Sequence, residues 1–435
     1  MGMVGRLARF KLRKTPVDIE RALRFVISDA GANVPYYRTA FEGAGVVPAQ
    51  VKCVEDLPRL PITDRDRLLA SGHEGHLRCG VDRQSLFKRH TSGTSGTPIT
   101  VYMNRAESLF RKASLIDSFL RNARLGFPMT IVDVGGDREA DSKDIVQRLG
   151  LVNVVRIVRS LPMGEQAECL RQVNPTVIEG RPSMLCVLAQ ELSRQGIDSV
   201  RPKLVVSFAE VLYPHVRKLL QDTFSCRVAD YYNCQEVGNI AWQCPEIPDR
   251  MHVNPATVVL EVVDEQGEPA PCGREGRVLV TNLYNTTMPF IRYKIGDRAA
   301  LLEPTRCSCG FVGRTIRLIG GRDEDFFVLP DDREISPRVI YAIAVQGLPL
   351  HGLGNDVYRA ARAFQIVQEE RDLIVVRAVP GPAYSRGLWK NLDSNFKALH
   401  PSMRVQVVEV EDLHPEPGGK FRQVLSRVAR ARGTS

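Results

Sequence analysis

Membrane and secretory features are missing from this sequence. It contains no run of about 18 apolar residues, which is the length that a membrane-spanning helix needs. The first residues also lack the apolar segment and small-residue cleavage site of a signal peptide. We therefore expect a chain with no membrane span that stays in the cytoplasm. The sequence has 43% hydrophobic and 25% charged residues and no low-complexity tract. This composition excludes a disordered or collagen-like chain.

A disulfide framework and a nucleic-acid surface are also poorly supported. The ten cysteines are spread over 435 residues with no secretion signal, so we expect free thiols or a metal site. Much of the net charge of +9 lies in residues 1–24 and 420–435, where the alternation of basic and aromatic residues typical of single-strand binders is missing. We interpret these ends as solvated helices and expect no nucleic-acid partner. A positive field would also attract ATP.

The chain is too long for one compact core, and its middle alternates strand and helix patterns. Apolar residues recur at helical spacing over 5–30 and 104–124, and a buried strand is expected at 129–136. Further strands are expected at 152–158, 176–178, 203–208 and 227–231, and helices near 141–150 and at 164–173, 182–195 and 214–223. This alternation predicts a layered α/β core with a largely parallel sheet.

After residue 252 the pattern changes. Short β-type runs separated by turns predict an antiparallel β subdomain, with strands at 257–263, 277–281, 290–293 and 298–302. The tail predicts a small α+β domain with helices at 337–345 and 386–400 and strands at 363–367, 372–376 and 404–410. We place the boundary near 320–325. The expected domains are 1–321, which would bind ATP and an acyl substrate, and a mobile lid, 322–435.

A Ser/Thr/Gly-rich segment is the first candidate for chemistry. Its glycines free the backbone to curl, so that hydroxyls and amide hydrogens can surround a polyphosphate. It lacks the Gly-Lys-Ser/Thr ending of a Walker loop, and a flexible turn is the alternative. The candidate phosphate-binding residues are Thr91, Ser92, Gly93, Thr94, Ser95, Gly96 and Thr97.

Five further motifs follow this loop along the chain. They are Phe208-Ala209-Glu210, Tyr231-Tyr232-Asn233-Cys234-Gln235-Glu236, Arg292-Tyr293-Lys294-Ile295-Gly296-Asp297, Gly321-Arg322 and Pro417-Gly418-Gly419-Lys420. With the Ser/Thr/Gly loop, they stand in the order of the adenylate-forming superfamily. From about residue 30 to Lys420 the sequence resembles the branch of phenylacetate–CoA ligases and their capsule-biosynthesis relatives. The resemblance implies an enzyme that activates a carboxylate with ATP.

The resemblance also implies a role for each motif residue. Glu210 and Tyr232 would lie at the nucleotide, Glu236 would hold Mg²⁺ against the phosphates, and Asp297 would accept the ribose hydroxyls. Arg322 would reach the ribose or phosphate. Lys420 would bridge the carboxylate and the α-phosphate, because charge stabilisation is the main catalytic task in this reaction. Without the resemblance, Glu236 could be a helix-start acid, Asp297 a turn acid and Lys420 a solvated lysine.

Some positions depart from the family pattern. Thr97 replaces a lysine, Asn233 replaces a glycine, and Glu324 stands where the hinge usually has Asp or Lys. The segment after this hinge also lacks the Gly-Val-Asn stretch that helps to line the thiol tunnel in phenylacetate–CoA ligases. Adenylation is therefore better supported than transfer to CoA.

Three cysteines and a histidine form a second candidate site. Cys244 and His252 precede most of the expected antiparallel subdomain, and Cys307 and Cys309 follow it. A Cys₃His set suits tetrahedral Zn²⁺, although buried thiols would explain the same spacing. Relatives in this branch often place the same residue types at these points. We expect a structural zinc, since four protein ligands leave no position open for water.

The expected acyl pocket lies at the carboxyl edge of the parallel sheet, where open α/β sheets bind ligands. Gly135, Gly136 and Arg181 follow predicted strands there, and ordinary turns are the alternative. Asn233 and Cys234 would line the same pocket. Cys234 could be a nucleophile, but no base is identifiable near it, and a pocket-lining thiol is the preferred interpretation.

These observations predict an AMP-forming acid–thiol ligase. It would form an acyl-adenylate from ATP and a carboxylic acid, with an aryl or related acid as the expected substrate, and then acylate a thiol such as CoA. The alternatives are a ligase that uses an amine or a carrier protein, and a nucleotide-binding homologue without turnover. The sequence leaves open the identity of the carboxylate, the acceptor, the pathway and the oligomeric state, for which a homodimer is one candidate.

Overall fold

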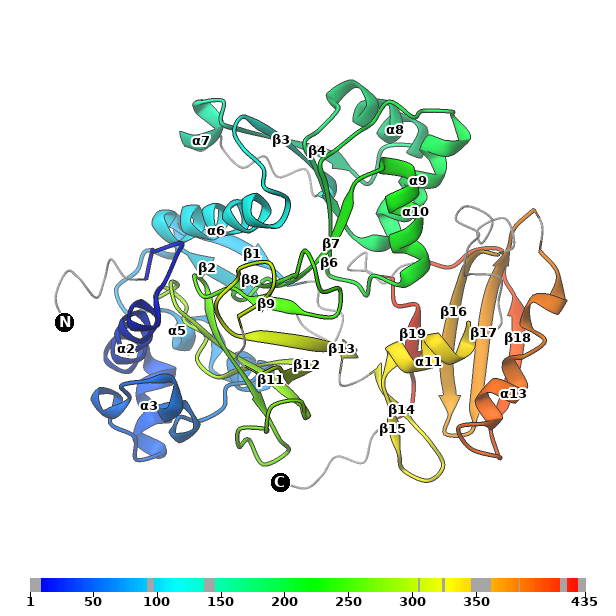
Figure 1. The fold of residues 1–435 in the computed structure, drawn as a ribbon. Coiled ribbons are helices and arrows are strands. Elements are labelled where there is room, and N and C mark those ends of the chain that lie inside the picture. The colour runs from blue at the N-terminus through cyan, green and yellow to red at the C-terminus, as the bar shows by residue number, and fades with distance from the viewer. Residues whose placement is uncertain are drawn as a thin grey trace. The chain divides into compact units, whose positions relative to one another are not determined.

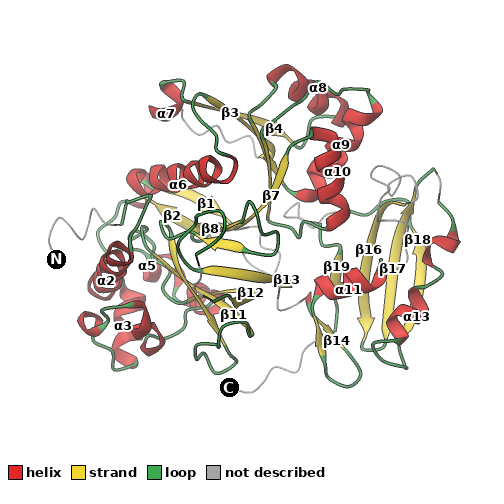
Figure 2. Cartoon of the chain, in the orientation of Figure 1, coloured by secondary structure: helices red, strands yellow, loops and turns green. Residues whose placement is uncertain are grey.

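The computed structural model describes residues 9–91, 98–136, 145–303, 306–322, 325–345, 361–382, 384–414 and 421–428 (Figures 1 and 2). The chain forms two compact units. The first unit comprises Met1–Phe127, Lys143–Arg148 and Ala229–Leu318. The second unit comprises Pro128–Ser142, Leu149–Val228 and Ile319–Ser435.

The first unit is built on a mixed set of strands that follow the order β10-β11-β12-β13-β9-β8-β7. The bounds are β7 (Arg227–Cys234), β8 (Gly238–Gln243), β9 (Met251–Val253), β10 (Val258–Val263), β11 (Glu275–Asn282), β12 (Tyr293–Leu301) and β13 (Thr315–Arg322). Antiparallel pairs join β10 to β11, β11 to β12, β13 to β9, β9 to β8 and β8 to β7. This confirms the predicted antiparallel region. A separate hairpin pairs β1 (Phe87–His90) with β2 (Thr100–Met103).

The helices of the first unit come mainly from the N-terminal part of the chain. They are α2 (Pro16–Asn33), α3 (Pro35–Gly43), η1 (Pro48–Gln50), η2 (Val54–Arg59), α4 (Arg65–Ala70), α5 (Gly72–His76), η3 (Arg83–Ser85), α6 (Arg105–Ala123) and α7 (Ile145–Arg148). One face of α2, with Leu23, Val26 and Ile27, packs into a core that includes Val259 and Ile291. Burial of this apolar face stabilises the helix against the strands.

Two predictions for the first unit need correction. Among the described residues, the helix expected over 5–30 begins at Pro16 and not at residue 9, because Thr15 caps it: the Asp18 amide donates to Thr15 Oγ1 at 3.3 Å. The two strands expected at 290–293 and 298–302 are one strand, β12. A register shift in its pairing with β11 lets Gly296, at φ +92°, lie inside the strand.

The second unit begins with a parallel sheet in the order β6-β5-β3-β4. Its strands are β3 (Met129–Gly136), β4 (Val152–Val158), β5 (Val177–Gly180) and β6 (Leu204–Phe208), and its helices are α8 (Met163–Val173), α9 (Pro182–Arg194) and α10 (Pro214–Phe224). Except for the helix near 141–150, which is described only as α7 at residues 145–148, the predicted alternation of strands and helices is confirmed to within a few residues. A mixed α/β fold follows from this sheet and from the strands of the first unit.

The C-terminal part of the second unit is an α+β arrangement, as predicted (Figure 1). It contains β14 (Phe327–Val328), β15 (Glu334–Ile335), α11 (Pro337–Ala344), β16 (Ala361–Glu370), β17 (Leu373–Pro380), η5 (Arg386–Trp389), α13 (Leu392–Lys397), β18 (Arg404–Glu409) and β19 (Val424–Ser426). Its sheet has the order β18-β17-β16-β19. The helix expected over 386–400 is divided, because η5 and α13 are separate segments.

One apolar core runs through the second unit. It includes Val132 and Leu219 from the parallel-sheet part and Tyr341 and Phe364 from the C-terminal part. The second unit therefore joins residues that the sequence assigns to two domains. The chain passes from the first unit to the second between Leu318 and Ile319, close to the expected boundary. The division into 1–321 and 322–435 stays a prediction.

No helix in the described part of the chain is both long enough and apolar enough to cross a bilayer. The cytoplasmic location stays a prediction.

Candidate functional site

Two acidic residues of the first unit that are predicted to belong to the site, Asp297 and Glu236, accept hydrogen bonds from tyrosines. The Tyr232 hydroxyl, on β7, donates to Asp297 Oδ2 on β12 at 2.7 Å. The Tyr293 hydroxyl, at the start of β12, donates to Glu236 Oε1 at 3.1 Å. Burial raises the pKa of Tyr293, with a further increase from Glu236, so the hydroxyl keeps its proton. The structure therefore brings the motif of residues 231–236 against the motif of residues 292–297.

Glu236 lies in the turn that joins β7 to β8, and not at a helix start. Gly238 follows it at φ +83°, a conformation that favours glycine. A side chain there would lie 3.3 Å from both Arg111 and the Tyr284 hydroxyl, so the turn leaves little space. This tight connection places Glu236 beside Tyr293.

Arg111 of α6 is a residue that sequence reasoning missed. Its Nη1 donates to the Gln235 carbonyl at 2.6 Å, and its Nη2 donates to the Cys234 carbonyl at 3.1 Å. The guanidinium thus holds the backbone of the turn that carries Glu236. Nothing in the sequence marks Arg111, because its partners, two main-chain carbonyls and the Gln235 side-chain oxygen, lie more than a hundred residues away.

Arg292, the first residue of its motif, is a structural residue. It is 2% exposed, adopts φ +44°, and its Nε donates to Glu261 at 3.2 Å. Its other nitrogens donate to the carbonyls of Pro58, Leu60 and Gly267 at 2.8–3.2 Å. A buried guanidinium needs such partners. It ties the loop around η2 to the start of β12 and so supports Tyr293.

The side chains of Asn233 and Cys234 also have defined surroundings. Asn233 Oδ1 accepts a hydrogen bond from Asn239 Nδ2 at 2.7 Å, at a register shift between β7 and β8. Burial and the neighbouring Glu236 raise the pKa of Cys234 well above its usual value. A thiol that stays protonated is a poor nucleophile, which supports the pocket-lining interpretation.

The structure describes only the flanks of the predicted phosphate loop. The Thr91 amide donates to the Ile99 carbonyl at 3.0 Å, and the Ile99 amide donates to Thr91 Oγ1 at 2.8 Å. These bonds close the base of the loop between β1 and β2. The predicted residues Ser92, Gly93, Thr94, Ser95, Gly96 and Thr97 lie outside the described residues, as do Glu324 and Lys420. Arg322 is the last residue of β13.

In the second unit, the residues predicted for the acyl pocket lie at strand ends. Gly135 and Gly136 end β3, and Arg181 follows β5 as the N-cap of α9. Gly135 has φ +84°, a conformation that favours glycine, and a side chain there would displace the end of Met184. The predicted position at the carboxyl edge of the parallel sheet is confirmed, and binding of an acyl group there stays a prediction.

Glu210 has contacts that the sequence does not reveal. It follows β6 and accepts hydrogen bonds from the Ser183 amide and hydroxyl, both at 3.0 Å, and from the Phe421 amide at 2.9 Å. Burial raises its pKa, against the effect of these bonds and of the nearby Arg181 charge. The carboxylate thus touches the residue that follows Lys420 in the chain.

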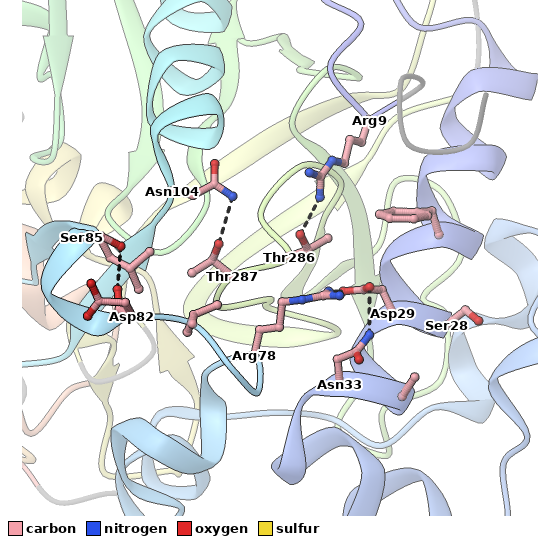
Figure 3. A pocket seen from close by; sticks show the side chains of 14 residues that line it. Arg9, Ser28, Asp29, Asn33, Arg78, Asp82, Ser85, Asn104, Thr286 and Thr287 are labelled. Atoms are coloured by element: carbon pink, nitrogen blue, oxygen red, sulfur yellow. Dashed lines mark hydrogen bonds and ion pairs between the residues drawn. The ribbon is translucent and has the colours of Figure 1, made fainter. Parts of the chain in front are cut away.

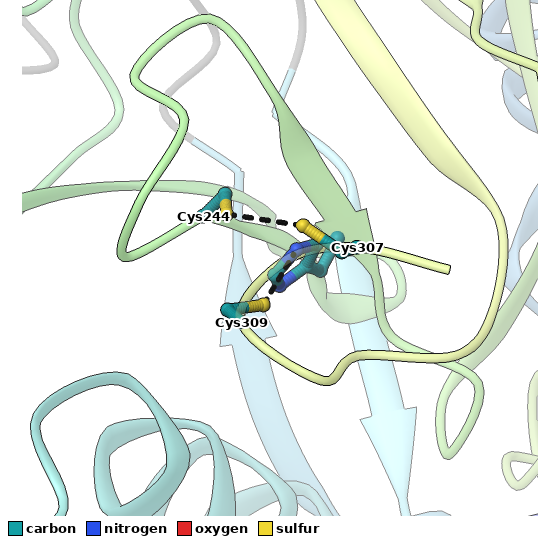
Figure 4. Close-up of side chains that lie close together, drawn as sticks. Cys244, Cys307 and Cys309 are labelled. Atoms are coloured by element: carbon teal, nitrogen blue, oxygen red, sulfur yellow. Dashed lines mark hydrogen bonds between the residues drawn. The ribbon is translucent and has the colours of Figure 1, made fainter. Parts of the chain in front are cut away.

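The predicted zinc ligands come together in the first unit (Figure 4). The donor atoms of Cys244, His252, Cys307 and Cys309 all lie within 4.8 Å of one another. Cys244 Sγ is 3.4 Å from Cys307 Sγ, and Cys309 Sγ is 3.6 Å from His252 Nε2. A disulfide needs about 2.05 Å, whereas ligands of tetrahedral Zn²⁺ at about 2.3 Å lie roughly 3.5–3.8 Å apart. The donor set and its spacing fit Zn²⁺.

The surroundings of this cluster favour a thiolate at Cys307, whereas burial raises the pKa of Cys309 to about 12. The amides of Glu246 and Ile247 both donate to Cys244 Sγ at 3.4 Å. Although burial works against it, hydrogen bonds from the Cys309 backbone and the Cys244 thiol lower the pKa of Cys307. The His252 ring stacks on Phe311 at 4.1 Å, which fixes its orientation. Such second-sphere contacts are typical of metal sites.

A pocket in the first unit contains none of the predicted site residues (Figure 3). It has a volume of about 690 Å³. Figure 3 shows Arg9 and Arg78 reaching it from two segments, with the Arg9 guanidinium at Thr286 and Arg78 paired with Asp29. Since Arg78 and Asp29 pair with each other, this pocket presents no strong preference for one sign of charge.

Comparisons with known proteins support the resemblance that the motifs indicate. No family model matches the chain. The chain is 26% identical to a phenylacetate–coenzyme A ligase of Pseudomonas putida, over 72% of this chain and 71% of that protein. It is 27% identical to the enzyme of the same name from Thermus thermophilus, over 74% and 73%. It is 24% identical to the protein CapK of Staphylococcus aureus, over 80% and 75%.

Solved structures share the fold. A 2-hydroxyisobutyryl-CoA ligase in its postadenylation state, bound to R3-HIB-AMP, matches with a TM-score of 0.77 and 18% identity over 96% of this chain and 91% of that one. The ATP-bound MatB from Rhodopseudomonas palustris matches with a TM-score of 0.54 and 15% identity over 82% and 70%. The expected α/β architecture of adenylate-forming ligases is confirmed.

Proposed function

We propose that this chain activates a carboxylic acid with ATP as an acyl-adenylate, releases pyrophosphate, and transfers the acyl group to the thiol of CoA. The observation that carries the proposal is the pairing of two motifs in the first unit: Tyr232 with Asp297, and Tyr293 with Glu236. These contacts bring the two motifs together, although their carboxylates are 61 residues apart in the sequence and β7 and β12 are not adjacent in the strand order.

The first step is an attack of the substrate carboxylate oxygen on the α-phosphorus of ATP, which breaks the bond to pyrophosphate. The adenylate that forms is a mixed anhydride with a good leaving group. The thiolate of CoA then attacks the acyl carbon and releases AMP. Both steps redistribute negative charge, so positioned cations and hydrogen-bond donors supply most of the acceleration.

Residue roles follow from the motifs and the contacts. Asp297 would accept the ribose hydroxyls, oriented by the 2.7 Å hydrogen bond from Tyr232. Glu236, held by Tyr293, would be the protein ligand of Mg²⁺, which neutralises phosphate charge when bound. Lys420 and Arg322 would contact the acyl phosphate, and residues 91–97 would surround the polyphosphate.

Cys244, His252, Cys307 and Cys309 would hold a structural Zn²⁺ in this proposal. Cys244 follows β8, His252 lies on β9, and Cys307 and Cys309 belong to the connection between β12 and β13. A metal there ties this connection to two strands. The four donor atoms lie together, and four protein ligands would leave no coordination position open, so a bound metal would stabilise the unit and not act on the substrate.

Pyrophosphate release over a panel of aryl, fatty and hydroxy acids tests the proposal. We expect release that depends on ATP, Mg²⁺ and one class of acid. Mass analysis of products with CoA, amines and a carrier protein then identifies the acceptor. Acid-independent ATP turnover, or none with any acid, would contradict the proposal. An amide product without a thioester would assign the chain to the amine-acylating ligases.

A further inference from the structure

The carboxylate of Glu210 joins two parts of the second unit that are far apart in the sequence. One oxygen, Oε1, accepts from the Ser183 hydroxyl at 3.0 Å and from the Phe421 amide at 2.9 Å. The other, Oε2, accepts from the Ser183 amide at 3.0 Å. Ser183 lies in the first turn of α9, whereas Phe421 immediately follows the predicted lysine loop. Three donors thus converge on one side chain.

The backbone before Glu210 is shaped for this contact. Ala209 adopts φ +68°, a left-handed conformation that alanine rarely takes. It turns the chain sharply after β6, at the carboxyl edge of the parallel sheet. Strained residues of this kind persist where the surrounding structure demands them. Here the turn brings Glu210 to the start of α9.

The segment after Phe421 is held as well. Arg422 Nη1 donates to Asp325 Oδ1 at 2.7 Å, and Asp325 is 5% exposed. The Arg422 carbonyl accepts from Gln365 Nε2 at 2.9 Å, and the Ile366 amide donates to the next carbonyl, that of Gln423, at 2.8 Å. Residues 421–423 are therefore bound to the sheet of the C-terminal part, and Glu210 adds the contact with the parallel-sheet part.

A structural explanation alone accounts poorly for an acid here. A neutral acceptor at position 210, such as asparagine or serine, could accept hydrogen bonds from the amide and hydroxyl of Ser183. Its burial would cost less desolvation free energy than burial of a carboxylate. The additional partner is the Phe421 amide, and a carboxylate has enough acceptor sites for all three donors. The charge is thus explained by the contact with the C-terminal segment.

We propose that Glu210 is a positioning residue that anchors the chain directly after Lys420 during adenylation and releases it for acyl transfer. This inference rests on the proposed function, and it gives Glu210 a role distinct from the predicted contact with the nucleotide. Among the described residues, the hydrogen bond from the Phe421 amide is the contact that joins this segment to Glu210, so the anchor can open when the C-terminal part moves.

Three variants test the anchor. Glu210→Gln keeps the size of the side chain but replaces one acceptor with a donor, so the three donors are no longer all satisfied. Glu210→Asp keeps the charge with a shorter reach. Ser183→Ala is the matched control, because it removes one donor to Oε1 and leaves the Phe421 bond. Thermal unfolding of each variant establishes that it folds.

Two half-reactions are then measured separately. In Glu210→Gln we expect single-turnover pyrophosphate release to slow by about tenfold, since small displacements of a catalytic segment are costly. Thioester formation from a supplied acyl-adenylate should change by less than about twofold, and KM for ATP should stay near that of the wild type. Ser183→Ala should keep both rates. Equal slowing of both half-reactions, or a loss confined to KM for ATP, would overturn the proposal.

A pH profile adds a signature that a purely structural role would not produce. The charged and titratable groups near Glu210 are Arg181, whose charge lowers the Glu210 pKa, and Tyr213. Asp325 and Arg338 also act on Tyr213. Protonation of Glu210 removes acceptor capacity, so wild-type adenylation should fall on acidification, and Glu210→Gln should lack this step. Glu210→Asp should keep it, and identical profiles for all three proteins would contradict the anchor.

Hydrogen exchange separates failure of this inference from failure of the proposed function. If the wild type releases no pyrophosphate with any acid, the proposed function fails, and exchange alone decides on the anchor. The peptide that contains Phe421 should exchange faster in Glu210→Gln than in the wild type or Ser183→Ala. Unchanged exchange would overturn the anchor whatever the activity.

Discussion

The acids of the first unit and the acid of the second unit are held in different ways. Asp297 and Glu236 accept from tyrosine hydroxyls within one set of strands, over sequence separations of 65 and 57 residues. Glu210 accepts from Ser183 and from a main-chain amide 211 residues away. The first arrangement joins two strands that do not pair directly, β7 and β12, and the turn after β7 within one unit. The second depends on docking of the C-terminal segment.

This difference matches the two tasks of the proposed enzyme. The nucleotide must be bound in every step, so its acids belong in a preformed sheet region whose hydrogen bonds do not rearrange. The segment after Lys420 is needed for adenylation and must then make room for the acceptor. A contact built from a few long-range hydrogen bonds can open with little disturbance to either core.

The largest expected effect compares the buried histidines of the two units. Burial lowers the pKa of His76 in the first unit to about 3 and that of His215 in the second unit to about 4. Because these values lie below the unfolded value of about 6.5, the folded state binds fewer protons, and stability falls as the pH drops below about 6.5. Each histidine should reduce the free energy of unfolding by about 3 kcal/mol between pH 7 and pH 4.

Urea unfolding at both pH values measures this loss. His76→Gln and His215→Gln should each flatten the pH dependence, whereas His414→Gln, at an exposed position, should not. If only one of the two variants flattens the pH dependence of the free energy of unfolding, the loss of stability in acid arises in that unit alone.

The next largest effect concerns the predicted role of Lys420 in the C-terminal segment. Lys420→Ala should slow acyl-adenylate formation by at least about a hundredfold, because one positive charge at the reacting phosphate is lost. Use of a supplied acyl-adenylate should stay nearly normal. Stopped-flow pyrophosphate detection and a thioester assay measure the two steps, with Lys390→Ala as control. Equal losses in both steps would remove Lys420 from its assigned role.

Substitution in the cysteine cluster should lower the stability of the first unit without changing Asp297 or Glu236. If the cluster holds zinc, the purified protein should contain about one zinc per chain, and Cys309→Ser should lose it and about 2 kcal/mol of stability. Affinity for ATP should change little. Cys272→Ser, at an exposed cysteine outside the cluster, is the control. Metal-free protein of normal stability would refute the assignment.

The predicted hinge gives a smaller effect on the second step. Proline fixes φ near −65° and removes a donor, so Glu324→Pro should restrict rotation of the C-terminal part. We expect normal single-turnover pyrophosphate release and acyl transfer slowed by at least about tenfold. Glu324→Ala is the control for loss of the side chain. Normal transfer in Glu324→Pro would place the hinge elsewhere.

The smallest expected effects distinguish the two tyrosine–carboxylate pairs of the first unit. Tyr232→Phe removes the donor to Asp297 and should raise KM for ATP by about fivefold, the value of one hydrogen bond. Tyr293→Phe removes the donor to Glu236 and should lower kcat by a similar factor. Steady-state kinetics at several Mg²⁺ concentrations separate the two. Identical changes in both variants would mean that the pairs do not serve different ligands.

Much of the fold was predictable because the elements are defined locally. The parallel strands and helices between residues 152 and 224 follow the predicted ranges closely, since apolar periodicity and turn residues act over short distances. Prediction failed where a tertiary contact changes a local pattern. Gly296 separates the two predicted strands, but a bulge opposite β11 accommodates it within β12. Residues 9–15 are not helical as predicted, because the helix has a capped start at Thr15.

Residue types and their spacing are sufficient to predict the α/β class, the order of the motifs and the Cys₃His set. Which of these residues meet depends on the folded chain. Arg111 reaches the turn before Glu236, Arg292 is buried as a structural tie, and Glu210 meets Phe421. These contacts join segments that are distant in the sequence, often through main-chain amides and carbonyls. Because nearly every residue has these groups, a sequence pattern cannot indicate which of them will be the partner.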